Sequence, residues 1–152
     1  MHVVSFLARL ASTRAPSAAG ACVLLAICLA GLLIGGNLTP NRQGFGTHSQ
    51  LGLPPCGFLV ASGFPCMTCG MTTSVSLAAQ GRLQDSARVQ PGGLVVAIGL
   101  ACGVWFSLHA LIAGPGVWRL ASNLFRTRVL IALGLVFAAA WATTILRWPP
   151  GL

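Results

Sequence analysis

The chain has 152 residues, of which 55% are hydrophobic and 7% are charged, and its mean hydropathy is +0.84. An ordinary soluble domain has about a quarter of its residues charged, so this composition excludes one. The formal charge is +8, from nine arginines and one acidic residue. The arginines stand at the ends of apolar runs and form no basic patch, which indicates contact with lipid headgroups and excludes nucleic acid as a partner.

Three apolar segments are long enough to cross a bilayer as helices, at residues 18–36, 92–113 and 129–146. A helix rises about 1.5 Å per residue, so about 20 residues span the hydrocarbon layer. Pro91 stands before the second segment, at the first turn of a helix, where proline is tolerated. We therefore predict an all-α integral membrane protein, a single membrane domain over residues 1–152, with three transmembrane helices.

The orientation of these spans is predicted from their flanking arginines. With the N-terminus in the cytoplasm, five arginines lie inside and four outside, and the arginines nearest the spans favour this arrangement. The long segment between the first two spans then lies outside the cytoplasm. Within the spans, Gly99 and Gly103 have the spacing of close helix packing, within one chain or in a dimer.

The segment at residues 51–90 carries the cysteine motif and a short helix. From residue 37 to 69 the chain is rich in glycine and proline and is predicted to be irregular. A helix is expected over residues 71–80, with Gly81 as its stop. Because this helix is moderately apolar, we expect it in the interface, or re-entrant and buried against the spans.

Three of the six cysteines fall within this segment: Cys56, Cys66 and Cys69. Cys66 and Cys69 are separated by two residues, a spacing that allows two thiols to bind one metal ion or to form a disulfide with each other. Gly70, directly after the pair, permits a tight turn. His48 is a candidate fourth ligand, which would complete a Cys3His zinc site. The residues predict either a metal site, with zinc as the ion considered, or a loop closed by a disulfide.

A redox function is the alternative, in which Cys66 and Cys69 act as a membrane thiol-disulfide oxidoreductase. A cysteine at the start of a helix has its thiolate stabilised there, which lowers its pKa. The chain lacks the alternating strands and helices of a thioredoxin-like domain. Any such activity would therefore resemble membrane-embedded dithiol enzymes, and we expect a non-enzymatic protein first.

The motif resembles a bacterial membrane-protein family catalogued as domain of unknown function 2752. The family hallmark is Cys-Pro-x-Cys-Gly-x-Thr-Arg, and the chain has Pro65-Cys66-Met67-Thr68-Cys69-Gly70-Met71-Thr72-Thr73 in its place. Cys56, Gly70, Thr72 and Pro91 also match family positions. Met67 replaces a proline, Thr73 an arginine, Arg82 an aspartate and Gln90 an asparagine.

The resemblance implies a small membrane protein and names no activity. We predict a multi-pass protein of the bacterial cytoplasmic membrane, structural or accessory in role, whose cysteine cluster binds a metal or forms a disulfide. Its expected partner is the lipid bilayer, and a homo-oligomer or larger membrane complex is left open.

Overall fold

A computed structural model describes residues 18–113 and 127–147 of the chain, and over these residues it is helical and contains no strand. Three long helices are α2 (Ala18–Asn37), α6 (Pro91–Ala113) and α8 (Thr127–Leu146). Each is long and apolar enough to cross a membrane. The predicted all-α class and the three candidate spans are confirmed, and together they indicate a membrane protein.

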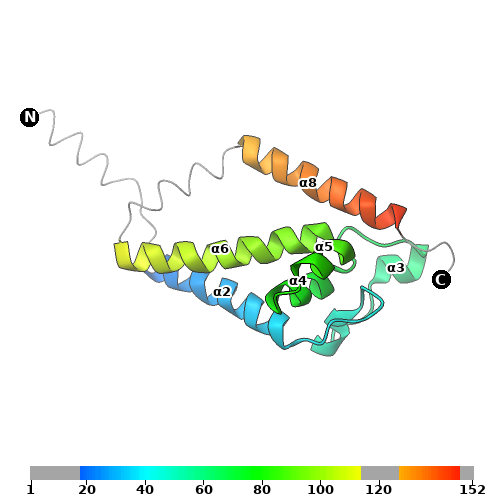
Figure 1. Ribbon diagram of the computed structural model, residues 1–152, viewed down its shortest axis with the longest axis horizontal. Coiled ribbons are helices and arrows are strands. Elements are labelled where there is room, and N and C mark those ends of the chain that lie inside the picture. The colour runs from blue at the N-terminus through cyan, green and yellow to red at the C-terminus, as the bar shows by residue number, and fades with distance from the viewer. Residues whose placement is uncertain (1–17, 114–126, 148–152) are drawn as a thin grey trace, which may run out of the picture.

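Helices α2 and α6 lie side by side, and small residues bring them close (Figure 1). A Cβ atom added at Gly31 would lie 3.2 Å from Leu100 Cδ1, and one at Gly103 would lie 2.5 Å from Cys28 Sγ. Gly99, by contrast, faces open space. Of the two glycines predicted to pack helices, Gly103 therefore does so within this chain, against α2.

Four short helices lie between α2 and α6 in the sequence and gather at one end of the long helices (Figure 1). They are η1 (Thr47–Leu51), α3 (Gly57–Ser62), α4 (Met71–Ala79) and α5 (Leu83–Val89). The prediction of an irregular chain from residue 37 to 69 was wrong where η1 and α3 form.

The glycines of this segment explain why the prediction was wrong. They lie at the ends of the short helices and do not prevent the helices from forming. Gly46 precedes η1 with a φ of 85°, and Gly63 follows α3 with a φ of 72°. Both conformations are left-handed and suit glycine. The N–H of Gly63 also donates to the carbonyl of Leu59, which closes the last turn of α3.

Helix α4 was predicted, with its stop. Gly81 has a φ of 80°, and its N–H donates to the carbonyl of Ala78 at 3.0 Å. The next N–H, of Arg82, reaches back to the carbonyl of Leu77 at 2.9 Å. These two bonds form a Schellman motif, which satisfies carbonyls that the helix end leaves open. The stop at Gly81 is confirmed.

Buried hydroxyl groups join α4 to the chain around α2, α5 and α6. Ser74 Oγ lies 2.7 Å from the carbonyl of Gln90, and Ser76 Oγ donates to the carbonyl of Leu38 at 2.8 Å. Both serines are fully buried. A Cβ atom at Gly93 would lie 2.5 Å from Ser74 Cβ, so α6 can approach α4 this closely only with glycine there. The short helix is thereby fixed against the ends of two spans.

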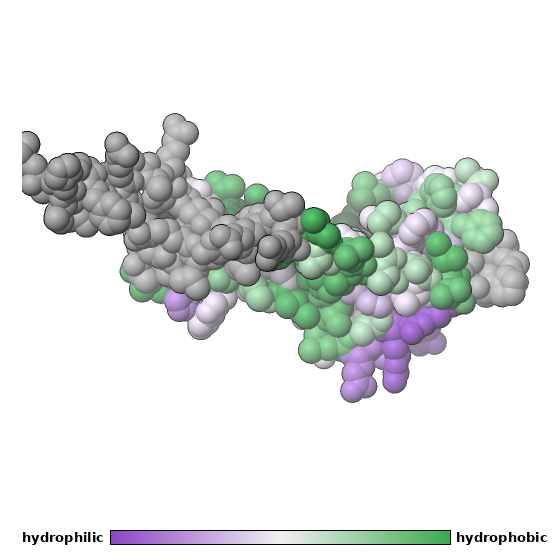
Figure 2. All heavy atoms as spheres, turned by 90° about the horizontal axis from the view of Figure 1, so that it is seen from above, coloured by the Kyte–Doolittle hydropathy of each residue, from purple (hydrophilic) through white to green (hydrophobic). Residues whose placement is uncertain are grey.

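The outer faces of the long helices are apolar. Ile112 is 86% exposed and Trp105 is 64% exposed within the single chain. Figure 2 shows hydrophobic atoms over much of the coloured surface. A group of strongly hydrophilic atoms lies along one edge, at the end of the molecule where the short helices are. This division suits a membrane protein whose short helices meet the interface, because exposed apolar helix faces are stable against lipid.

Candidate metal centre

The fold brings the three predicted cysteines together. Cys56 immediately precedes α3, while Cys66 and Cys69 lie in the turn that leads into α4. Their three Sγ atoms lie within 4.8 Å of one another, and the Sγ atoms of Cys56 and Cys66 are 3.4 Å apart. We call these residues the cysteine site. They form a group that can hold a metal ion.

The backbone around Cys69 depends on glycine. The N–H of Cys69 donates to the carbonyl of Cys66 at 3.0 Å, which closes a turn between the two thiols. Gly70 then has a φ of 81°, and a Cβ atom there would lie 2.8 Å from the carbonyl oxygen of Gly44. Both the left-handed conformation and the close approach require glycine. The structure therefore gives a physical reason for Gly70 after the cysteine pair.

Two distant side chains hold the cysteine turn from outside. Gln90 donates from Nε2 to the carbonyl of Met67 at 3.0 Å, and its Oε1 accepts the N–H of Gly92 at 2.6 Å. Trp141 of α8 donates from Nε1 to the carbonyl of Pro65 at 3.2 Å. Sequence reasoning missed both. Gln90 stood out only as a departure from the family asparagine, and Trp141 carried no signal.

Two further residues that the sequence singled out border this region. Pro91 is the first residue of α6, where its fixed φ suits a helix start. Thr72 lies in the first turn of α4, is half-buried and lines the same cavity as the cysteines. Both residues belong to the structure that surrounds the cysteine site.

The two thiols of the cysteine pair differ in acidity. Burial raises the pKa of Cys66, but hydrogen bonds from Thr68 and Cys56 outweigh burial and bring this pKa down to about 7. The Thr68 hydroxyl lies 3.2 Å from Cys66 Sγ. Burial raises the pKa of Cys69 to about 12, and the nearby Cys66 thiolate contributes to the rise. Cys66 is therefore the thiol that ionises first.

A cavity of 560 Å³ opens beside the cysteine site. All three cysteines line it, and so does His48. His48 is outside the group of thiols, and its Nε2 lies 3.1 Å from the carbonyl oxygen of Pro54. The structure therefore places the predicted fourth ligand on the same cavity, with its ring nitrogen directed to the backbone.

The remaining cysteines lie on the long helices. Cys28 is buried against Gly103, while Cys22 and Cys102 are exposed within the single chain. His109 stacks on Trp105 with ring centroids 4.5 Å apart. These residues are separate from the cysteine site.

Fold and site together define a helical membrane protein with a thiol cluster at one end of its candidate spans. Residues 56–105 match the family model described as Protein of unknown function (DUF2752). The match confirms the resemblance seen in the sequence and covers α3 to most of α6. No curated protein and no solved structure matches the chain.

Proposed function

We propose that this protein is a structural or accessory protein of the bacterial cytoplasmic membrane, multi-pass and embedded in the bilayer alone or as a homo-oligomer, whose cysteine site binds one metal ion. The observation that carries the proposal is the placement of the Sγ atoms of Cys56, Cys66 and Cys69 within 4.8 Å of one another. Zinc is the first candidate ion, because it favours thiolate ligands and tetrahedral sites.

The spacing of the sulfur atoms supports this choice. Zinc–sulfur bonds of about 2.3 Å in a tetrahedral site place two sulfurs about 3.8 Å apart. The Cys56–Cys66 distance of 3.4 Å and the 4.8 Å limit for the group bracket this value. Small rotations about the Cα–Cβ bonds would suffice, because each cysteine contributes a single flexible Sγ atom.

The fourth position of a tetrahedral ion would face the cavity beside the site. His48 lines that cavity and can complete a Cys3His set after its ring turns from the carbonyl of Pro54. A water molecule or a ligand from solution is the alternative occupant, and it would leave a position of the kind that catalytic zinc sites keep open. His48→Ala separates the two, because it weakens binding only if the imidazole is a ligand.

Two rival functions predict different chemistry at the same thiols. A structural disulfide would join Cys66 either to Cys56, whose Sγ atom is 3.4 Å away, or to Cys69, whose Sγ atom lies within 4.8 Å. A thiol oxidoreductase would use Cys66 and Cys69, and neither the family match nor the other comparisons support it. A single preparation distinguishes these functions.

The experiment measures metal content and free thiols on the detergent-purified full chain. We expect about one zinc per chain in the wild type and its loss in Cys56→Ser, Cys66→Ser and Cys69→Ser. Cys102→Ser is the matched control, because this thiol lies on α6 away from the site, and it should keep the metal.

The opposite results are equally clear. If the protein contains no metal and two of its thiols react only after reductant is added, the disulfide is established. In a preparation that contains no metal, Cys66 and Cys69 that change redox state together when oxidant and then reductant are added would favour the oxidoreductase. Either result would overturn the metal site.

A further inference from the structure

A second cavity shares Cys69 and Gly70 with the cavity beside the cysteine site, and its own lining is basic. Its volume is 290 Å³, at the lower end of the roughly 300–1,000 Å³ that small-molecule sites occupy. Three arginines from three parts of the chain line it: Arg42 after α2, Arg88 in α5 and Arg147 directly after α8. We call it the arginine cavity.

The charge in the arginine cavity is largely uncompensated. Asp85 is the only acidic side chain of the whole chain. It pairs with Arg82, outside the cavity, at 2.8 Å and with Arg88 at 3.7 Å. The salt bridges that the structure describes involve no other arginine, so Arg42 and Arg147 have no carboxylate side chain to pair with. Within the described residues, the Arg147 guanidinium donates from Nη1 to the carbonyl of Arg88 at 3.4 Å.

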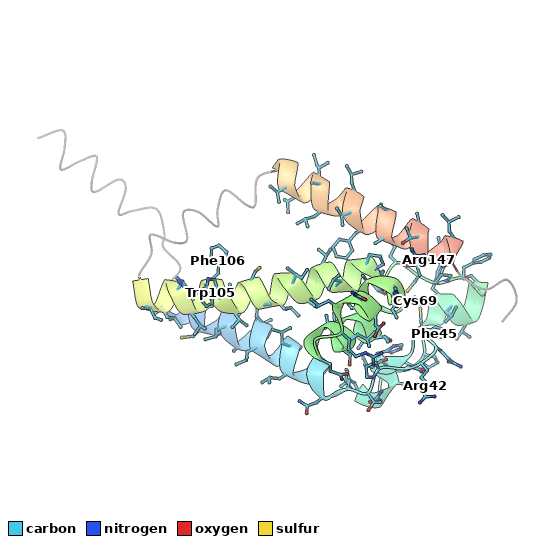
Figure 3. The ribbon with its side chains drawn as sticks, in the orientation of Figure 1. Arg42, Phe45, Cys69, Trp105, Phe106 and Arg147 are labelled. Atoms are coloured by element: carbon cyan, nitrogen blue, oxygen red, sulfur yellow. The ribbon has the colours of Figure 1, made fainter. Side chains whose placement is uncertain are left out.

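The position of the arginine cavity is the second observation. It lies where α2 has ended, α6 begins and α8 ends, and this is the end of the long helices at which a bilayer would give way to water. In Figure 3, Arg42 and Arg147 lie on opposite sides of Cys69 and Phe45. Apolar atoms of Phe45, Val89 and Pro91 form another part of the lining. A ligand with a charged group and an apolar neighbour would match both kinds of surface.

We propose that the arginine cavity binds a phosphate group. Guanidinium groups present forked donors that suit the several oxygens of a phosphate, and three of them around one cavity can share its charge. Phosphate groups are also the anions concentrated at a membrane surface. The phosphate belongs either to the headgroup of an anionic lipid or to a free phosphate in solution. Cys69 lines both cavities, but none of the three arginines lines the cysteine cavity, so the arginines can be changed without removing a proposed metal ligand.

The test compares two sources of phosphate on the full chain in detergent. Dioctanoyl phosphatidylglycerol and dioctanoyl phosphatidylcholine are added in native mass spectrometry, and inorganic phosphate is titrated by calorimetry. The variants are Arg42→Gln and Arg147→Gln, each alone and both together. The matched control for each single variant is Arg82→Gln, which removes one positive charge outside the cavity. Each arginine near a membrane surface is expected to contribute about fivefold to binding, so the double variant should bind about thirtyfold more weakly.

Selective retention of phosphatidylglycerol, lost in the double variant and kept in the control, would support the lipid headgroup. Binding of inorganic phosphate with the same pattern would support the free anion. No binding of any probe, or an equal loss in Arg82→Gln and the single variants, would overturn the site and leave only general charge attraction. The single variants Arg42→Gln and Arg147→Gln repeat the test if circular dichroism shows that the double variant is misfolded.

Discussion

The side-chain amide of Gln90 and the backbone carbonyl of Met67 are joined by a hydrogen bond of 3.0 Å, which ties the cysteine turn to the first turn of α6. Gln90 is fully buried, and its amide oxygen accepts the N–H of Gly92. One side chain therefore caps a span and holds the loop that carries two of the three thiols.

Gln90→Ala should lower both stability and metal affinity. It leaves the buried N–H of Gly92 without its partner, which costs about 1–3 kcal/mol, and it removes the hydrogen bond that holds the carbonyl of Met67. Thermal unfolding in detergent and zinc titration measure the two effects. Gln84→Ala, at an exposed position of α5, is the control. A Gln90→Ala variant as stable as Gln84→Ala would show that the bridge contributes nothing.

Gly70→Ala should be more damaging than Gly63→Ala. Both glycines have a positive φ, so each alanine incurs the left-handed penalty of about 1–2 kcal/mol. Only at Gly70 would the new Cβ atom also lie 2.8 Å from the carbonyl oxygen of Gly44, while Gly63 has open space around it. The difference between the two unfolding temperatures isolates the steric clash. Equal unfolding temperatures would mean that the backbone at Gly44 moves without cost.

Alkylation of the metal-free protein should depend on pH in a way that identifies Cys66. The thiolate is the reactive form, and its fraction rises with pH through the pKa. With a pKa of about 7, Cys66 should reach half its maximal rate near pH 7, while Cys69, with a pKa raised to about 12, should stay unreactive there. Mass spectrometry after iodoacetamide treatment measures each site.

The hydroxyl of Thr68 is the group to remove in the same assay. Thr68→Val deletes the hydrogen bond to Cys66 Sγ, so the half-maximal rate should move to higher pH. Thr72→Val is the matched control, since Thr72 lines the same cavity and the pKa of Cys66 shows no contribution from it. An unchanged profile in Thr68→Val would assign the acidity of Cys66 to another cause.

Gly103→Ala should destabilise the contact between α2 and α6, and Cys28→Ala should rescue it. The added Cβ atom would lie 2.5 Å from Cys28 Sγ but 3.6 Å from Cys28 Cβ, an ordinary contact. Overpacking of this kind costs about 1–3 kcal/mol. A double-mutant cycle of unfolding free energies in detergent gives the coupling directly. Gly99→Ala, which adds a methyl group into open space, should change little.

The spans and the end of α4 were predictable because their signals are local. A run of apolar residues predicts a membrane helix. Gly81 ends α4 with a left-handed conformation, and the N–H groups of Gly81 and Arg82 then donate to carbonyls of the last turn. The grouping of Cys66 with Cys69 was also local. Their proximity to Cys56, at 3.4 Å from Cys66, depends on α3 and on the turn at Gly63, which the sequence did not reveal.

The arginine cavity could not be predicted from the sequence at all. Arg42 lies in the loop after α2, Arg88 in the last turn of α5 and Arg147 directly after α8, and no spacing in the sequence links them. Their flanking positions predicted contact with headgroups in general. Only the packing of α6 between the other elements shows that the three line one cavity.

The bond from Trp141 to Pro65 spans 76 positions of the chain. During synthesis the cysteines therefore emerge well before the indole that steadies their turn. A chain that ended after α6 would hold every thiol of the cysteine site, and every residue of the family match, without this support. The cysteine turn gains this hydrogen bond only after the last candidate span has been made and packed against it, so the thiols come first and the indole second.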